Sequence, residues 1–334
     1  MNQTNGKNRI KSVLKWVLWV VLIQFLLFNI SAVFYGYRLT YFYNATSSEQ
    51  PHSKNIFIKT WDLFAGPRFQ KSVIDEVPHF PFETVHLTTR QKLTIEGWYV
   101  PTDSARGTVI LVHGLGQNKS MLLKQAYEFM YYGYNVLLID LRAHGNSSGN
   151  ISTLGVCESE DVKLAYDYIV HKGEKNIVLY GVSLGATVIA KAIYDYALSP
   201  SRVILETPFD GIKSLFEKRI RMLGFPEEPF GSFITFWASI ERRFNGFTQC
   251  TSKYAERVKC PVLLEYGELD QIVSTRETKQ IFDHIAAKQK RLVEFKNAYH
   301  EFLLNKDPGK WRTEMSEFLG NDSSFSDGHP GAHR

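Results

Sequence analysis

Residues 177–186 constrain the fold of this chain more than any other stretch. An apolar run leads into the pattern Gly181-x-Ser183-x-Gly185, and residues 186–194 have the composition of a helix. A serine at a sharp strand-to-helix turn is held in a strained conformation that exposes its hydroxyl. The two glycines avoid collisions there, and the helix N-terminus stabilises nearby negative charge. The stretch therefore predicts a nucleophilic Ser183, which also requires a histidine, an acid and an oxyanion hole.

Apolar runs and helical patterns alternate on both sides of this turn. Period-two alternation over residues 82–101 predicts an antiparallel hairpin before them. Strands are predicted at 108–112, 135–140, 177–180, 202–206, 261–266 and 291–296, and helices at 119–132, 158–171, 183–197, 275–287 and 300–318. This order is typical of the α/β class, with a doubly wound, mostly parallel sheet.

Residues 209–259 interrupt the alternation with helical patches and many aromatic residues. An insertion at this point lies over the carboxyl edge of the strands, where ligands bind, so we expect a helical cap. One interpretation is that aromatics such as Phe233 and Trp237 line an acyl-chain pocket while basic residues contact anionic headgroups. The alternative is that the aromatics fill the core of the cap and the basic residues face water. The basic residues are Lys213, Lys218, Arg219, Arg221, Arg242 and Arg243.

Residues 16–37 contain no charged side chain and are long enough to span a bilayer. A cleaved signal peptide would fit a shorter apolar run followed by a small-x-small site, so an uncleaved transmembrane anchor is favoured. Residues 1–15 carry basic side chains and no acid, which predicts that they stay in the cytoplasm and that the rest of the chain lies outside. The basic residues are Lys7, Arg9, Lys11 and Lys15.

The remaining organisation follows from length and composition. A chain of 334 residues, 44% of them hydrophobic, suffices for one large domain at 81–320 behind an anchor. Residues 38–80 are expected to be a connector, and 321–334 a disordered tail. The net charge of +5 forms no basic stripe, which argues against nucleic acid as a partner. Three cysteines show no metal-ligand spacing, and Cys250 and Cys260 would pair only in an oxidising compartment.

The strand at 108–112 ends in His113-Gly-Leu115-Gly, a candidate oxyanion loop. A tetrahedral intermediate needs two backbone N–H donors aimed at its oxyanion. We expect one from Leu115 and the other from Leu184, directly after the nucleophile. His113 precedes the serine in the chain, so we assign it a structural role in this loop.

An acid and a histidine follow the last two predicted strands. Asp270 lies just past the strand at 261–266, where a carboxylate can orient an imidazole. Glu268 is the reserve candidate, and Glu265 should lie within the strand. His300 lies in the loop before the final helix, so the order along the chain is Ser183, Asp270, His300.

Over residues 80–320 the chain resembles the α/β-hydrolases, in particular the serine-aminopeptidase-like and monoacylglycerol-lipase-like branch, which includes membrane-anchored members. The segments that carry the resemblance are His113-Gly-Leu-Gly, Asp140-Leu-Arg-Ala-His-Gly-Asn-Ser-Ser-Gly149, Gly181-Val-Ser-Leu-Gly and Cys260-Pro-Val-Leu-Leu-Glu-Tyr-Gly-Glu-Leu-Asp270. Ala143 stands where the branch commonly has glycine, which affects a turn and not the chemistry. The resemblance implies a Ser-His-Asp hydrolase that needs no metal or organic cofactor.

These patterns together predict a single-pass membrane protein whose catalytic domain lies on the non-cytoplasmic side. We expect a serine hydrolase that cleaves carboxylic esters, thioesters or amides, of small molecules or lipids, through an acyl-enzyme. An acyltransferase on the same residues is the rival enzyme. A catalytically inactive binding or scaffold protein would lack one of the three residues, and none is missing. A dehalogenase or epoxide hydrolase would carry aspartate in place of Ser183.

Overall fold

A computed structural model describes residues 3–44 and 56–320, with the side chains of residues 3–10 excepted. The expected tail at 321–334 and part of the expected connector, 45–55, lie outside the described residues.

One mixed sheet forms the centre of the domain, and within the described residues it has eight strands in the order β10-β9-β8-β7-β5-β6-β4-β3. Its strands are β3 (Glu83–Thr88), β4 (Thr94–Val100), β5 (Thr108–Val112), β6 (Asn135–Ile139), β7 (Ile177–Val182), β8 (Arg202–Glu206), β9 (Val262–Gly267) and β10 (Lys290–Phe295). The β3–β4 and β4–β6 pairs are antiparallel, and the other pairs are parallel. The predicted hairpin and the mostly parallel sheet are therefore both present.

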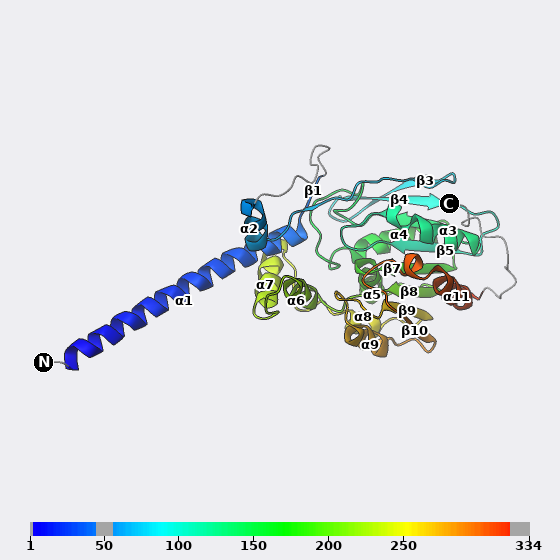
Figure 1. Ribbon diagram of the computed structural model, residues 1–334. Coiled ribbons are helices and arrows are strands. Elements are labelled where there is room, and N and C mark those ends of the chain that lie inside the picture. Colours follow the sequence, from blue (N-terminus) through cyan, green and yellow to red (C-terminus); the bar gives the residue numbers. More distant parts are fainter. Residues whose placement is uncertain (1–2, 45–55, 321–334) are drawn as a thin grey trace.

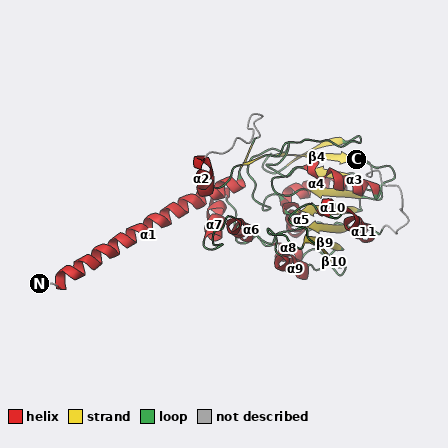
Figure 2. Cartoon of the chain, in the orientation of Figure 1, coloured by secondary structure: helices red, strands yellow, loops and turns green. Residues whose placement is uncertain are grey.

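Helices cover both faces of this sheet (Figure 2). One face carries η1 (Lys119–Leu122), α3 (Leu123–Tyr131), α10 (Leu303–Lys306) and α11 (Pro308–Leu319), and the other carries α4 (Ser159–His171), α5 (Leu184–Tyr196), α8 (Thr251–Ala255) and α9 (Thr275–His284). Strand β5 shows why two layers are needed. Val109 and Leu111 pack into one core while Ile110 and Val112 pack into the other, and all four are fully buried.

The predicted cap insertion contains two longer helices, α6 (Ile212–Met222) and α7 (Phe230–Arg242), beyond the edge of the sheet. They lie where α1 (Gln3–Thr40) meets the domain, and α1 then projects far beyond it (Figure 1). Residues 11–40 of α1 are long and apolar enough to cross a membrane, and an 18-residue window within them has a mean hydropathy of 2.4. Side chains such as Trp16 and Leu18 are largely exposed, as expected for a helix that has no protein neighbour there.

The last turns of α1 pack on the cap, so the helix continues past residue 37 as part of the domain. Gly36 lies so close to α7 that an added Cβ would come within 2.9 Å of the Ala238 nitrogen. The Trp237 Nε1 group donates to Asn29 Oδ1 at 3.2 Å, and Arg242 Nε donates to Thr40 Oγ1 at 2.7 Å. The end of α1 and the cap therefore form one packed unit.

The expected connector is more structured than its composition indicates. It contains α2 (Ile56–Ala65) and the short parallel pair of β1 (Phe42–Tyr43) and β2 (Phe69–Gln70). The segment after α1 is tied to the domain, because Phe42 N donates to Asn150 O at 2.7 Å and Ser152 N donates to Thr40 O at 3.0 Å.

The cap residues have more than one kind of neighbour. Phe233 packs against Phe28 of α1, with ring centroids 4.9 Å apart. Lys213 pairs with Glu217 at 2.8 Å and Arg221 pairs with Glu227. Both cations are thus paired within the cap, and their contact with anionic headgroups stays a prediction.

Candidate active site

Ser183 occupies the turn between β7 and α5 in a strained backbone conformation, with φ 51° and ψ −111°. The flanking glycines are required by close packing. A Cβ at Gly185 would lie 2.1 Å from the Val112 carbonyl oxygen, and one at Gly181 would lie 2.6 Å from the Gly185 carbonyl carbon. Ser183 N donates to Glu206 O at 2.8 Å, which fixes the turn against the end of β8.

The structure brings the three predicted residues into one chain of hydrogen bonds. His300 Nε2 lies 3.0 Å from Ser183 Oγ, and His300 Nδ1 lies 2.7 Å from Asp270 Oδ2. The Asp270 side chain is 1% exposed and that of His300 is 20% exposed, so the carboxylate is shielded while the imidazole reaches solvent. This arrangement can move a proton from the serine to the histidine.

Asp270, and not the reserve candidate Glu268, contacts the histidine. The other carboxylate oxygen of Asp270 accepts hydrogen bonds from Ile272 N and Val273 N, each at 2.8 Å, which holds the side chain in place. Glu268 accepts from Asn297 N at 3.0 Å instead. Glu265 lies within β9, as expected, and is fully buried.

The loop after β5 lies beside Ser183 and is held by its own side chains. Gly114 N donates to Gln117 Oε1 at 2.8 Å. His113 is fully buried, its Nδ1 bonds the Gly114 carbonyl at 2.7 Å, and its Nε2 accepts from Leu141 N at 3.1 Å. Burial lowers the pKa of His113 to about 4, so it stays neutral and structural, as expected.

A small pocket of about 80 Å³ opens between this loop and His300, and Leu115, Ser183 and His300 line it. Leu184 begins α5, so its N–H belongs to the first turn, which has no intrahelical acceptor. The pocket has room for one small oxygen-bearing group next to Ser183 Oγ.

Gln117 and Glu206 support this site, and sequence reasoning missed both. Glu206 Oε1 accepts from Leu303 N at 2.9 Å, just after the His300 loop, and Glu206 Oε2 accepts from Tyr180 Oη at 2.7 Å. Burial raises the pKa of Glu206. The sequence signals that could have identified them are an acid at the end of an apolar strand, Glu206, and an amide side chain three residues after Gly114, Gln117.

The segment 140–149 is a structural support for the neighbouring loops. Asp140 Oδ2 accepts from buried Lys119 Nζ at 2.5 Å, and an added Cβ at Gly145 would meet that same carboxylate oxygen at 2.2 Å. Ala143 has φ 65°, in the left-handed region that favours glycine. The departure from the family pattern at Ala143 therefore lies at a turn, as expected.

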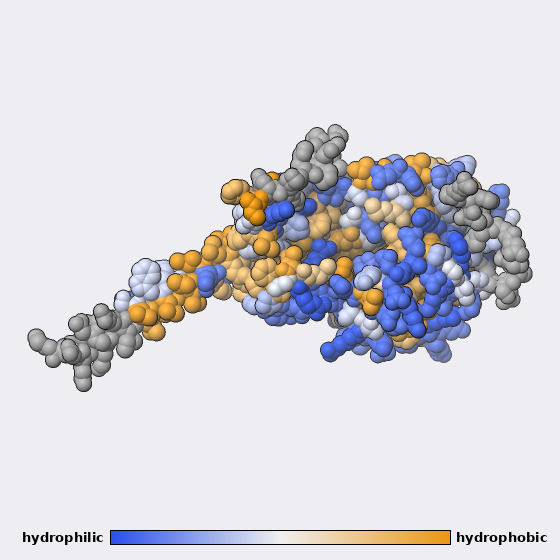
Figure 3. All heavy atoms as spheres, viewed as in Figure 1, coloured by the Kyte–Doolittle hydropathy of each residue, from blue (hydrophilic) through white to orange (hydrophobic). Residues whose placement is uncertain are grey.

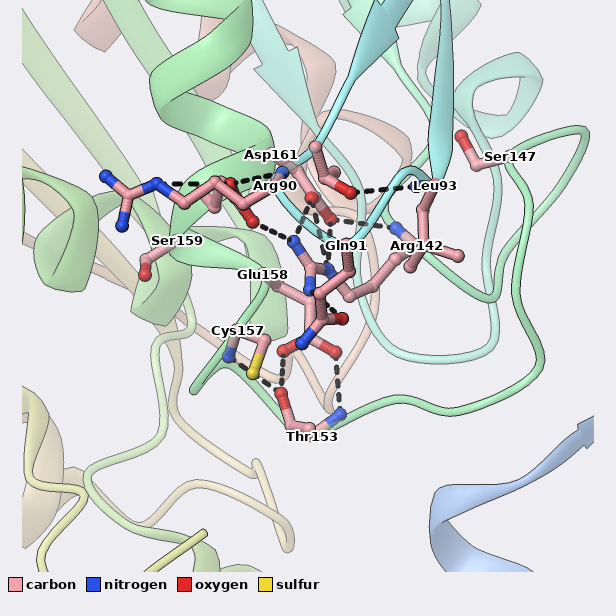
Figure 4. Close-up of polar contacts among 12 residues, drawn as sticks. Arg90, Gln91, Leu93, Arg142, Ser147, Thr153, Cys157, Glu158, Ser159 and Asp161 are labelled. Carbon is pink, nitrogen blue, oxygen red and sulfur yellow. Dashed lines mark hydrogen bonds and ion pairs between the residues drawn. The ribbon is translucent and has the colours of Figure 1, made fainter. Parts of the chain in front are cut away.

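Arg142 in the same segment is anchored on α4 (Figure 4). Its Nη2 group lies 2.7 Å from Asp161 Oδ1 and 3.0 Å from Glu160 Oε2. Glu158 nearby accepts from Ser152 Oγ at 2.8 Å, so the loop that receives the end of α1 is held as well. All three cysteines, Cys157, Cys250 and Cys260, are free thiols, so Cys250 and Cys260 do not pair.

The fold and the site define the class of protein: this is a serine hydrolase of the α/β-hydrolase fold, of the esterase and lipase type. The chain matches the family model Hydrolase_4, described as "Serine aminopeptidase, S33", over residues 103–227 and 236–307. These matched segments make up more than half of the chain, and the protein belongs to this family.

Two curated proteins and one solved structure that are similar to this chain differ in how much of each chain is aligned. The lysophosphatidylserine lipase ABHD12 of Danio rerio is 26% identical over 208 residues, 58% of this chain and 51% of the relative. An uncharacterized membrane protein of Saccharomyces cerevisiae, YNL320W, is 24% identical over 236 residues, 69% of this chain and 77% of the relative. The Pyrococcus furiosus esterase Pf2001 shares the fold, with a TM-score of 0.64 at 23% identity over 75% of this chain and 96% of that one.

Proposed function

We propose that the protein is a membrane-anchored hydrolase of carboxylic esters, thioesters or amides that works through a Ser183–His300–Asp270 triad. The hydrogen-bond chain from Ser183 Oγ through both nitrogens of His300 to Asp270 carries this proposal. Apolar α1 supports the membrane anchor, and the basic residues before it support a domain outside the cytoplasm.

The first half-reaction follows from the geometry. Ser183 Oγ attacks the substrate carbonyl carbon while its proton passes to His300 Nε2. The resulting oxyanion fits the small pocket, where the N–H groups of Leu115 and Leu184 donate to it. The tetrahedral intermediate collapses, and His300 returns the proton to the leaving alcohol, thiol or amine. The acyl group remains bonded to Ser183.

Water completes the cycle by the reverse proton movements. His300 Nε2 accepts a proton from the attacking water, and Ser183 Oγ leaves with that proton as the carboxylic acid forms. Asp270 stabilises the imidazolium throughout, because its other oxygen is already held by two backbone N–H groups.

The substrate class follows from the anchor and the relatives. An anchored domain meets substrates at a bilayer surface, and a relative bears the name lysophosphatidylserine lipase. We therefore place lipid esters ahead of peptides among the substrates.

The test uses the full-length protein in detergent, with a fluorophosphonate probe and p-nitrophenyl acetate. Ser183→Ala should abolish labelling, and Ser183→Ala or His300→Ala should lower kcat by several orders of magnitude. The double variant should be little worse, because the residues act as a unit. Asp270→Asn should lower kcat by roughly 10⁴-fold.

Glu268→Gln is the matched control, since that carboxylate accepts a bond from Asn297 N and does not contact His300. It should keep most of the activity. Near-normal ester hydrolysis by Ser183→Ala would end the proposal, and loss with Glu268→Gln but not with Asp270→Asn would reassign the acid.

A further inference from the structure

An apolar pocket of about 330 Å³ lies outside the catalytic centre, at the place where the anchor enters the domain. Its walls come from three parts of the chain that are far apart in sequence: α1, α2 and the cap. Leu27 and Ala32 line it from α1, Thr60 from α2, and Ile220 and Ile234 from the cap. Nothing in the proposed catalytic steps uses this space.

Helix α2 is a fixed wall of the pocket, because α1 holds it through side-chain hydrogen bonds. Tyr35 Oη donates to Leu63 O at 2.8 Å, and Ser31 Oγ donates to Phe64 O at 2.5 Å. Arg38 pairs with Asp62 at 3.3 Å. The polar groups of Ser31 and Tyr35 are thus already engaged with α2, which leaves the pocket with an apolar lining.

The mouth of the pocket is surrounded by exposed apolar side chains. Phe57 on α2 is 80% exposed, and Met222 and Phe225 at the end of α6 are also exposed. Figure 3 shows hydrophobic surface along α1 that continues onto the adjoining part of the domain, while the opposite end is largely hydrophilic. Such a surface around a membrane-spanning helix is suited to the apolar region of a bilayer.

Helix α6 contributes side chains both to this pocket and to the core cluster next to the nucleophile turn. Leu215 belongs to the core cluster that contains Leu184, directly after the nucleophile, while Ile220 lines the pocket. Leu115 of the oxyanion loop packs against the same cluster as Ile220. Leu115 also lines the small pocket beside Ser183, so this one side chain contacts the surroundings of both pockets.

We propose that this pocket binds the acyl chain of a lipid ester that enters from the bilayer, with the anchor helix as one wall of the substrate site. The inference rests on the proposed hydrolase function and specifies its substrate. A long chain would pass Leu115, with its ester at Ser183 and its end between α1 and α2. The anchor then selects long chains in addition to holding the enzyme at the membrane.

The test compares p-nitrophenyl palmitate and p-nitrophenyl acetate with full-length protein in mixed micelles. Leu27→Trp fills the pocket from α1, and Leu26→Trp places the same indole one residue away, outside the lining. Thr60→Trp fills it from α2, with Ile58→Trp as its control. Each filling variant should lower kcat/KM for palmitate at least about tenfold, the effect of roughly two lost methylene contacts. Acetate hydrolysis should stay within about twofold.

Two results would overturn the inference while leaving the hydrolase intact. One is wild-type palmitate hydrolysis by both filling variants. The other is equal loss in the filling variants and their controls, which would indicate a change in membrane insertion. A wild-type protein that hydrolyses neither ester and whose Ser183 does not react with a fluorophosphonate would instead refute the proposed function itself.

Discussion

Two buried acids lie side by side near the candidate active site, and they differ in how many hydrogen bonds their carboxylates accept. Glu206 and Glu265 are register partners on β8 and β9. Glu206 accepts hydrogen bonds from Leu303 N and Tyr180 Oη, whereas neither carboxylate oxygen of Glu265 has a hydrogen-bond partner among the described residues. Burial and the neighbouring Glu206 raise the pKa of Glu265 well above its usual range. A neutral Glu265 therefore avoids two adjacent buried charges.

This raised pKa predicts a stability that falls as pH rises. Above pH ~4.3 the unfolded glutamate loses its proton while folded Glu265 keeps it, so the free energy of unfolding decreases by up to ~1.4 kcal/mol per pH unit until the folded pKa is passed. Glu265→Gln should remove this slope and raise the thermal midpoint more at pH 8 than at pH 5. Exposed Glu256→Gln is the control. Parallel pH profiles of Glu265→Gln and wild type would contradict the assignment.

At the scale of elements, the contact between α1 and α7 determines how the anchor joins the cap. Small side chains let two helices approach closely, and Gly36 faces the backbone of Ala238 at the closest point. Asn29 and Thr40 accept hydrogen bonds from Trp237 and Arg242 on either side of that point. These three contacts, spread along the last turns of α1, hold it against α7.

The substitution Gly36→Ala tests this contact, because the sign of its effect on the free energy of unfolding depends on how closely the two helices approach. Alanine in a helix interior normally stabilises by about 0.5–1 kcal/mol relative to glycine. Here the new methyl would press on α7, so we expect a net loss of about 1–3 kcal/mol, read as a lower thermal midpoint of the detergent-solubilised protein. Gly309→Ala in α11 is the matched control, since its nearest neighbour would be 3.7 Å away. A stabilised Gly36→Ala variant would show that the helices do not meet as described.

At the scale of the whole molecule, one end is apolar and the other is polar. The α1 helix, the exposed face of α2 and the end of α6 form a continuous hydrophobic region, and the sheet lies beyond it (Figure 3). The enzyme should therefore sit against the membrane with its cap towards the bilayer, and not at the end of a free tether.

The orientation across the membrane is predicted from the basic residues before the apolar segment, Lys7, Arg9, Lys11 and Lys15. A reporter fused to the C-terminus should be active only if it is of a kind that functions outside the cytoplasm. Added protease should reach the domain in intact cells or spheroplasts. A domain protected from protease in intact cells would reverse the orientation and leave the proposed chemistry unchanged.

Local signals in the sequence determined the fold class and the candidate catalytic residues. Strand and helix periods, the two glycines around Ser183 and the order of Asp270 and His300 are properties of short segments, so they are readable without tertiary contacts. The alternation of strands and helices along the chain then required one mostly parallel sheet. The three residues lie together at the carboxyl edge of its strands.

Only the tertiary structure decided what the cap, the anchor and the connector do together. Composition could not separate aromatic residues that line a cavity from those that pack on another helix, and Phe233 proved to contact Phe28. Composition also gave no reason to expect that α2 packs beside α1, or that Glu206 accepts a hydrogen bond from Leu303 N just after the His300 loop. These contacts join residues far apart in the chain, and their energies depend on close packing and paired polar groups that exist only once the elements have assembled.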